Sequence, residues 1–216
     1  MSFVYNYEKR GHLQPFHHVT LLSASPRRKA LLDFLNPDIC PVTIDERVIE
    51  EHFMGLFADK GFLTRAAMTC CEISKAKSNR PLSEDTLYIS ADTIVVSEDA
   101  ILNKPADLFQ AKQMLLSYLG KTHYVVTSVC LRTRDYLDVF YTLAEVTFSP
   151  YYPALKTVID DYVHQKQQLD KAGAYGIQEL DPRLISKISG DLHTIIGFPV
   201  AETSLRLFGG QESSNS

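Results

Sequence analysis

Residues 18–35 read HVTLLSASPRRKALLDFL, and they predict a strand, a tight turn and a helix in succession. The apolar run at residues 18–22 is typical of a short buried strand. Ser25 is a favourable helix N-cap, because its hydroxyl can accept a hydrogen bond from a free backbone N–H, and Pro26 follows where a missing N–H costs nothing. Apolar residues then recur on one helical face between residues 30 and 35.

The first turn of this helix carries an unusual charge. Arg27 and Arg28 lie where the helix dipole is already positive, so they cost stability unless an anion binds beside them. Free N–H groups, the hydroxyls of Ser23 and Ser25 and two guanidinium groups together favour phosphate binding. The alternative is a pair of solvated arginines on a surface helix, which a short motif alone does not exclude.

The rest of the chain alternates between helical and β-type patterns. The expected helices are within residues 46–76 (clearest from 62), 107–119, 154–167 and from Pro199 to before 209, and the expected strands are 87–96, 123–132, 139–148 and 184–188. A short polar turn joins the runs 123–132 and 139–148, which predicts an antiparallel hairpin. Strands alternating with helices, plus one hairpin, predict an α/β fold with a mixed sheet.

The composition limits the class of protein. The chain has 216 residues, 45% of them hydrophobic, which suits one large domain or two lobes that share a cleft. A formal net charge of −4 argues against a nucleic-acid partner, and no apolar run is long enough to span a membrane. Residues 1–17 lack the apolar core of a signal peptide and are expected to form a ragged extension, residues 18–208 a single domain, and residues 209–216 a disordered tail.

The four cysteines show neither a CxxC spacing nor a disulfide framework. We expect buried thiols in a reducing compartment, which predicts a cytoplasmic location. The histidines show no metal-binding spacing, and the chain has no Walker-type phosphate loop.

Asp92 interrupts the apolar strand pattern of residues 87–96. A buried carboxylate is costly unless a metal ion, a cationic side chain or backbone donors accompany it, and Thr93 adds a hydroxyl beside it. Glu46 is a second carboxylate that could share a divalent cation with Asp92, because hard cations prefer oxygen ligands. The alternatives are a structural aspartate at a strand end and a solvated Asp45-Glu46 pair.

Two lysines and one loop complete the set of candidates. Lys104 precedes a proline, which favours an extended loop conformation, and Lys75 lies near a helix end. Residues 170–178 read DKAGAYGIQ, and their small side chains let a ligand approach the backbone closely. Lys171 adds a cation, and Gln178 offers a donor and an acceptor suited to a base edge. The alternatives are solvated lysines and a flexible connector.

Taken together, these segments resemble the Maf family of nucleoside triphosphate pyrophosphatases. The matching pieces come in the family's order with similar spacing: Ser23-Ala24-Ser25-Pro26-Arg27-Arg28, Lys75-Ala76, Ala91-Asp92-Thr93, Leu102-Asn103-Lys104-Pro105, Gly120-Lys121-Thr122-His123 and residues 170–178, followed by Gly197-Phe198-Pro199 near the end. The resemblance spans about residues 19–207.

This resemblance implies an elongated, two-lobed α/β fold with a central cleft, in which residues 18–208 form the catalytic domain. It implies hydrolysis of a nucleoside triphosphate to the monophosphate and pyrophosphate with a divalent metal cation, Mg²⁺ or Mn²⁺. Members are often dimeric, so a homodimer is a candidate assembly. Ala-Asp-Thr together with Gly-Ile-Gln is similar to the branch that acts on dTTP and UTP rather than on 7-methyl-GTP.

The resemblance also assigns roles by position. Asp92 matches the proposed general base, and Arg27, Thr93 and Gln178 match positions tied to substrate choice. Five cations could meet the triphosphate, and Ser23 and Ser25 could hydrogen-bond its oxygens; the cations are Arg27, Arg28, Lys75, Lys104 and Lys171. Asp92 would take the proton of the attacking water or, with Glu46, hold the metal, and sequence does not separate these two roles.

Two departures from the family pattern keep alternatives open. The stretch between Glu46 and Lys75 lacks a Pro-x-x-Tyr pattern, and residues 190–194 read GDLHT where the family usually has Gly-Ser-Tyr-Ser-Asn. One alternative is the same chemistry on 7-methyl-GTP or another modified nucleotide. The other is a regulator of septum formation that binds nucleotides without cleaving them.

Overall fold

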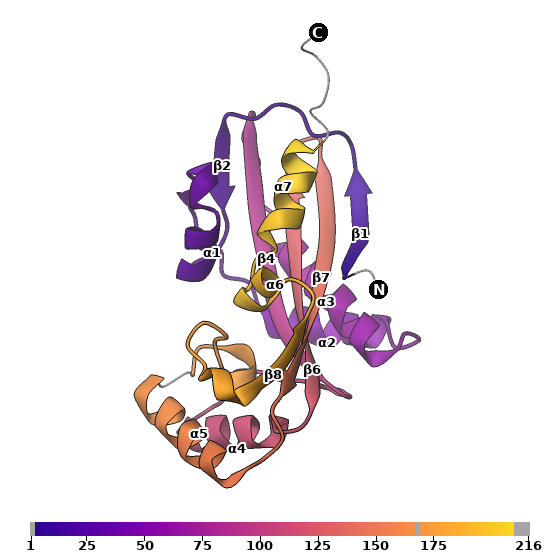
Figure 1. Cartoon of the computed structure of the whole chain (residues 1–216). Coiled ribbons are helices and arrows are strands. Elements are labelled where there is room, and N and C mark those ends of the chain that lie inside the picture. Colours follow the sequence, from indigo (N-terminus) through magenta and orange to yellow (C-terminus); the bar gives the residue numbers. More distant parts are fainter. Residues whose placement is uncertain (1–2, 167–168, 210–216) are drawn as a thin grey trace.

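The computed structural model describes residues 3–166 and 169–209, and in them a single mixed sheet forms the frame of an elongated molecule (Figure 1). Its strands follow the order β1-β7-β6-β4-β2-β3, with β5 paired to β4 and β8 paired to β7. The strands are β1 (Val4–Arg10), β2 (His18–Leu21), β3 (Asp38–Ile39), β4 (Thr86–Ser97), β5 (Ala100–Ile101), β6 (Thr122–Arg132), β7 (Leu137–Phe148) and β8 (Ile185–Ser189).

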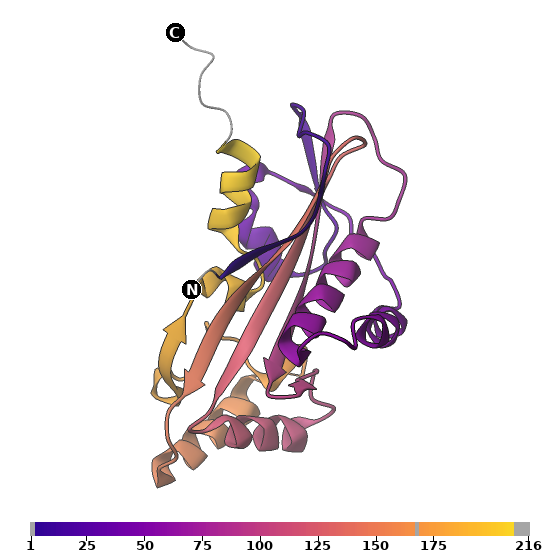
Figure 2. The same ribbon diagram turned by 90° about the vertical axis from the view of Figure 1, so that its right-hand side faces the viewer.

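Helices cover both faces of this sheet. They are α1 (Pro26–Leu31), α2 (Glu46–Leu56), α3 (Phe62–Lys77), α4 (Leu108–Tyr118), α5 (Pro153–Lys166), α6 (Leu192–Ile196) and α7 (Val200–Phe208), with short 3₁₀ turns at Asp33–Leu35, Ala172–Ala174 and Pro182–Leu184. Figure 2 shows α3 along one face of the long strands and α7 on the other. The expected α/β fold with a mixed sheet is confirmed.

The strand pairing matches the expected pattern. β2 pairs in parallel with β4, whereas β4, β6 and β7 pair antiparallel, and β6 with β7 is the predicted hairpin.

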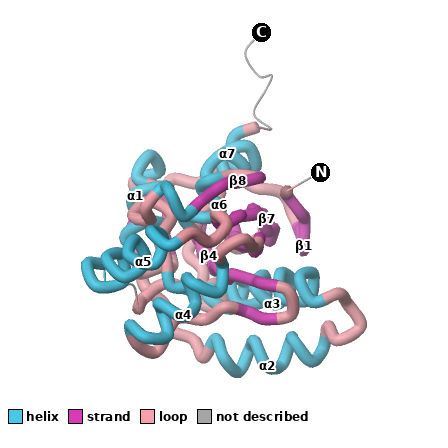
Figure 3. The backbone as a smooth tube through the Cα atoms, turned by 60° about the horizontal axis from the view of Figure 1, so that its bottom comes forward, coloured by secondary structure: helices cyan, strands magenta, loops and turns pink. Residues whose placement is uncertain are grey.

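The tube in Figure 3, seen from the lower end, places α2 beyond α3 on the outside of the sheet. α2 begins at Glu46 because the Asp45 carboxylate caps it, accepting a hydrogen bond from the Val48 N–H at 3.2 Å.

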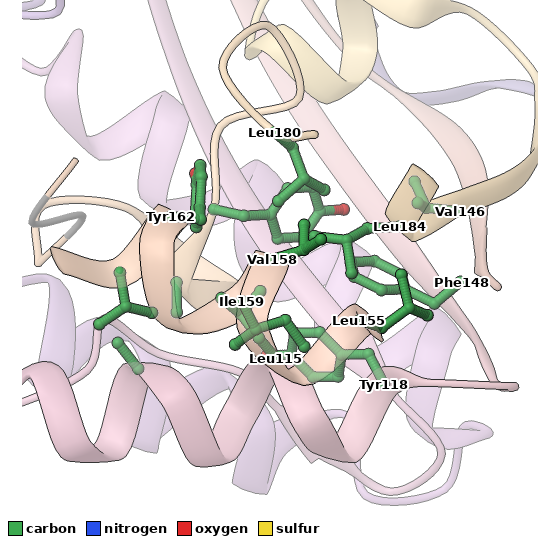
Figure 4. Packing of buried hydrophobic residues seen from close by; sticks show 14 of the residues in the cluster. Leu115, Tyr118, Val146, Phe148, Leu155, Val158, Ile159, Tyr162, Leu180 and Leu184 are labelled. Carbon is green, nitrogen blue, oxygen red and sulfur yellow. The ribbon is translucent and has the colours of Figure 1, made fainter. Parts of the chain in front are cut away.

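Separate apolar clusters stabilise the two ends of the long strands. At one end, α1 and α7 pack on β2, β4 and β7 around Phe140 and Phe198. At the other end, α4 and α5 enclose the cluster shown in Figure 4, where Leu115, Phe148 and Ile159 are fully buried. Since β4, β6 and β7 run through both ends, the sheet itself fixes one end relative to the other (Figure 1).

The expectation of a ragged N-terminal extension is wrong for residues 4–10. They form β1, which pairs antiparallel with β7. Tyr7 and Glu8 also anchor it to α3, since the Tyr7 hydroxyl donates to Glu72 at 2.5 Å and Glu8 lies 2.8 Å from Lys75. The run Glu8-Lys9-Arg10 concealed this strand, because charged residues are depleted in strands and only an edge position tolerates them.

Most of the predicted tail, from residue 210 onward, lies outside the described residues, and Gly209 caps the C-terminal end of α7. Cys70, Cys71 and Cys130 are buried free thiols, and Cys40 is partly exposed. Within residues 3–166 and 169–209, no helix is both long and apolar enough to cross a bilayer. The cytoplasmic location and the homodimer stay predictions.

His123 should make stability depend on pH. Its ring is buried, its Nε2 lies 2.7 Å from the Tyr175 hydroxyl, and burial lowers its pKa to about 4. The unfolded chain therefore binds more protons below pH 6.5, so this contribution is complete above that pH and is lost as the pH falls toward 4. Between pH 7.5 and 5.5 we expect His123 to reduce the free energy of unfolding by about 1.4 kcal/mol.

The measurement is urea unfolding at both pH values for the wild type and His123→Gln, which keeps a hydrogen-bonding group without titrating. Between pH 7.5 and 5.5, the free energy of unfolding should fall by about 1.4 kcal/mol less in the variant than in the wild type. Equal losses in the two proteins would show that His123 does not titrate differently on folding.

Candidate active site

A cavity of about 480 Å³ opens where distant segments of the chain converge. Its walls are the turn after β2, the start of α2, the middle of β4, the loop 170–178 and residues 195–197. This volume is typical of small-molecule sites. Apart from Lys75, every residue predicted for the site lines this one cavity: Ser23, Ser25, Arg27, Arg28, Glu46, Asp92, Thr93, Lys104, Lys171 and Gln178.

The strand lengths explain where the cavity lies. β2 ends at Leu21 opposite Ile89, whereas β4 continues to Ser97, so β4 has no β2 neighbour beyond that point (Figure 1). Asp92 and Thr93 lie beyond that point, and both line the cavity. Ligands in open α/β sheets commonly bind beyond the carboxyl ends of parallel strands, which is the position that the end of β2 provides.

The turn after β2 has the predicted geometry. Pro26 begins α1, and the Ser25 hydroxyl caps it by accepting from the Arg28 N–H at 3.4 Å. The Ser23 hydroxyl in turn accepts from the Ser25 N–H at 3.2 Å. The two serines therefore shape the turn with their own hydroxyls, in addition to lining the cavity.

The two arginines differ, although both were predicted to clamp the triphosphate. Arg28 donates to the Gly197 carbonyl at 3.0 Å, to Ser23 at 3.3 Å and to Thr93 at 3.0 Å. Its guanidinium is thus fixed by three parts of the protein. Arg27 is more exposed, and its guanidinium lies 4.0 Å from the Asp170 carboxylate. Arg27 is therefore the more available of the two for a ligand.

Asp92 lies in a buried network of opposite charges. The Lys77 ammonium lies 2.8 Å from both Asp92 Oδ1 and Glu46 Oε1, and Cys70 donates to Asp92 Oδ2 at 3.5 Å. Burial alone would raise the pKa of Asp92, but Lys77 and then Arg28 outweigh burial and hold it below its usual value. The same carboxylates raise the pKa of Lys77 against the effect of its burial. Both groups are charged at neutral pH.

Lys77 takes the place that was predicted for Lys75. Lys75 lies outside the cavity, where it pairs with Glu8 at 2.8 Å and Glu72 at 3.3 Å. The helix period could have shown this, since Cys70, residue 73 and Lys77 recur at steps of three and four on the buried face of α3. Lys75 lies off that face, so it is not a substrate-binding candidate.

The facing wall is the loop 170–178, and it is held firmly. The Gly173 N–H donates to the Leu102 carbonyl at 3.0 Å, and its carbonyl accepts from the Tyr118 hydroxyl at 3.2 Å. Gly173 has φ of 73°, and a Cβ there would lie 3.2 Å from Val95, so the position requires glycine. The interpretation of this segment as a flexible connector is therefore wrong, because the loop is fixed to its neighbours.

Residues 18–208 match the family model described as "Maf-like protein". The chain belongs to this Maf-like family. It is 36% identical over 181 residues to a dTTP/UTP pyrophosphatase of Bacillus cytotoxicus, covering 84% of this chain and 89% of the relative. Proteins of the same name from Halalkalibacterium halodurans and Bacillus velezensis are also 36% identical, over 85% of this chain and 90% and 91% of theirs. The resemblance seen in the motifs is thus confirmed.

The carboxylates of the Maf-like cavity decide whether it suits a divalent metal ion. Glu46 and Asp92 present two carboxylate oxygens to one cation, the Lys77 ammonium. The part of the chain that the structure describes contains no group of three or more His, Cys, Asp or Glu side chains that could hold a metal. Mg²⁺ is usually held by one or two carboxylates plus substrate phosphates, so this pair fits a cation that is also bound by a nucleotide.

The unusual segment 190–194 does not itself line the Maf-like cavity. Asp191 caps α6 by accepting from the His193 N–H at 3.0 Å, and Thr194 is buried against the sheet. The cavity wall is formed by the next residues, 195–197, of which only Gly197 belongs to a motif quoted above. The departure from the family pattern therefore affects how α6 is supported rather than which groups face the cavity.

Proposed function

We propose that this Maf-like protein is a nucleoside triphosphate pyrophosphatase that hydrolyses dTTP and UTP to the monophosphate and pyrophosphate. Modified pyrimidine nucleotides are further candidate substrates. The observation that carries the proposal is that a charged carboxylate, Asp92, lines the same cavity as Arg27, Lys104 and Lys171. The names of the relatives supply the substrate class, dTTP and UTP.

The cations suit the charge of the substrate. A nucleoside triphosphate carries close to four negative charges, so its binding requires several positive groups at one place. Arg27 and Lys171 lie on opposite walls, and Asp170 lies 4.0 Å from the first and 3.0 Å from the second. The triphosphate would replace Asp170 as their common anionic partner. Preorganised cations of this kind stabilise the charge that develops during phosphoryl transfer.

Asp92 is the group proposed to act on the water that attacks the α-phosphorus. Lys77 and Arg28 keep its carboxylate ionised at neutral pH, which is the state required either to accept a proton or to hold a cation. Lys77 also fixes its position through Oδ1 at 2.8 Å. Positioning of a charged group in this way is the principal means by which proteins assist phosphoryl transfer.

Glu46 and Asp92 are the residues proposed to hold Mg²⁺ or Mn²⁺ together with the substrate phosphates. A bound divalent cation would neutralise phosphate charge and lower the pKa of a bound water. Lys77, which joins the two carboxylates, keeps them close and compensates their charge until the substrate binds. Gln178, on the facing wall, can offer both a donor and an acceptor to the base.

Arg27→Ala should lower kcat/KM for dTTP by roughly 10- to 100-fold, because a charged hydrogen bond to phosphate is worth about 1.5–3 kcal/mol. The melting temperature should stay close to that of the wild type, since Arg27 is partly exposed and its ion pair with Asp170 is long. Arg47→Ala is the matched control, since Arg47 lies on an exposed face of α2 and pairs with Glu51. Unfolding of Arg27→Ala with unchanged activity per folded molecule would make this arginine structural.

A nucleotide panel tests the proposed function itself. Purified protein is assayed for pyrophosphate release from dTTP, UTP, CTP, GTP and 7-methyl-GTP in the presence of Mg²⁺ or Mn²⁺. We expect the highest kcat/KM with dTTP and UTP. The highest value with 7-methyl-GTP would move the protein to the other substrate class. Tight binding without hydrolysis in either metal would favour a nucleotide-binding regulator.

A further inference from the structure

Threonines form a row across the middle of the sheet, beneath α6. Thr93 of β4 is in register with Thr127 of β6, and Thr127 is in register with Thr142 of β7. Thr194 of α6 contacts this row. Its hydroxyl lies 2.7 Å from the Thr142 hydroxyl, and its backbone carbonyl lies 2.8 Å from the Thr127 hydroxyl. Thr127 and Thr194 are fully buried. The row starts at the cavity, because Thr93 is one of its lining residues.

The direction of the hydrogen bonds in this row is determined by its buried end. A carbonyl oxygen can only accept, so Thr127 must donate its single hydroxyl proton to Thr194. The Thr127 oxygen lies 2.9 Å from that of Thr93 and has no second proton to donate. The hydroxyl of Thr93 must therefore donate to Thr127.

Arg28 restricts Thr93 further. The Arg28 Nη2 donates to the Thr93 hydroxyl oxygen at 3.0 Å. This hydrogen bond uses one of the two lone pairs of the Thr93 oxygen. The proton of Thr93 points to Thr127, and one lone pair is left. Towards the cavity Thr93 can then only accept a hydrogen bond. Phosphate oxygens are also acceptors, so this hydroxyl cannot bind them.

We propose that Thr127 is a positioning residue that makes Thr93 an acceptor-only contact and thereby sets which group of the substrate Thr93 recognises. The inference rests on the proposed function, since it concerns the same cavity. The matching group must be a hydrogen-bond donor. Thymidine triphosphate has two such donors at neutral pH, the N3–H of the base and the 3′-hydroxyl of the sugar. Uridine triphosphate has the same base donor.

Substituting Thr127 with valine tests this directly, because valine has nearly the same shape but no hydroxyl. Without its acceptor, the Thr93 hydroxyl can rotate and donate towards the cavity. The enzyme should then discriminate less against an analogue in which an acceptor replaces the donor. Two analogues distinguish the base donor from the sugar donor: dCTP, whose N3 is an acceptor, and 3′-O-methylthymidine triphosphate, whose 3′-oxygen can only accept.

The readout is the ratio of kcat/KM for dTTP to that for each analogue. In Thr127→Val we expect one ratio to fall by roughly five- to tenfold from its wild-type value, as for the loss of one neutral hydrogen bond. A fall in the dTTP to dCTP ratio assigns Thr93 to the base, and a fall in the other ratio assigns it to the sugar. Wild-type values for both ratios in Thr127→Val would overturn the proposal.

Two further variants separate positioning from stability. Thr127→Ser keeps the hydroxyl and should retain both wild-type ratios. Thr122→Val removes a hydroxyl from a similar threonine pair of β6 and β7, with Thr122 and Thr147 2.9 Å apart at an exposed position, and should also retain them. If Thr127→Val does not fold, Thr127→Ala makes the same prediction, since it also lacks the hydroxyl.

Binding of the same nucleotides, measured by isothermal titration calorimetry, gives both ratios without hydrolysis. A wild type that binds the nucleotides but hydrolyses none of them contradicts the proposed function, while the affinity ratios still test Thr127. Equal affinity ratios in wild type and Thr127→Val overturn the proposal in that case as well.

Discussion

Asp92→Asn is expected to lower kcat/KM for dTTP by roughly 10²- to 10⁴-fold, the range typical of a lost general base. An amide can neither take a proton from water nor bind a divalent cation as a carboxylate does. The fold should persist, because Glu46 still lies 2.8 Å from Lys77 and compensates its charge. Pyrophosphate release under steady-state conditions measures the activity, and thermal unfolding measures the fold.

Asp59→Asn is the matched control for this variant. Asp59 is an exposed aspartate that pairs with Lys60 and lies outside the cavity, so its substitution should leave kcat/KM within about twofold of the wild type. Activity of Asp92→Asn within the same limit would remove Asp92 from the mechanism. Loss of the folded state would instead assign Asp92 a structural role.

Arg206→Met is expected to reduce the free energy of unfolding by about 3–5 kcal/mol, as when one partner of a buried ion pair is removed. Arg206 on α7 lies 2.8 Å from the fully buried Asp138 and 2.7 Å from Glu202. It also donates to Asn6 of β1 at 2.6 Å and stacks over the Phe140 ring at 3.9 Å. Without it, the Asp138 carboxylate would remain buried with weaker compensation.

Urea unfolding of Arg206→Met against Arg183→Met measures this effect. Arg183 makes a similar two-contact pair with Asp181, but at an exposed position, so its substitution should change stability by less than about 1 kcal/mol. A similarly small change in Arg206→Met would show that the Arg206 network does not fasten α7 and β1 to the sheet.

Local patterns were sufficient to predict most of the fold. The strand–turn–helix at residues 18–31 depends on an N-cap at Ser25 and a proline at the first helical position, both of which act within a few residues. The hairpin of β6 and β7 was predictable for the same reason. β1 was not, because its partner β7 lies more than 120 residues away in sequence and a charged edge strand carries no local signal.

The candidate site was predictable as a set of residues but not as a network. Lys75 and Lys77 are two residues apart on α3, and only the orientation of the helix decides which reaches Asp92. The sequence likewise gave no indication that Arg28 is held by Gly197 and Thr93, while Arg27 remains more exposed. Such differences depend on contacts between segments that are distant in sequence.

We infer that this cavity directs water to the α-phosphorus of a pyrimidine nucleoside triphosphate. Hydrolysis of dTTP in ¹⁸O-labelled water, with mass spectrometry of the products, tests it most directly. The expected products are dTMP and pyrophosphate, with the label in dTMP. Label in the pyrophosphate would mean attack at the β-phosphorus, and release of dTDP with inorganic phosphate would mean cleavage between the β- and γ-phosphates; either result would exclude attack at the α-phosphorus.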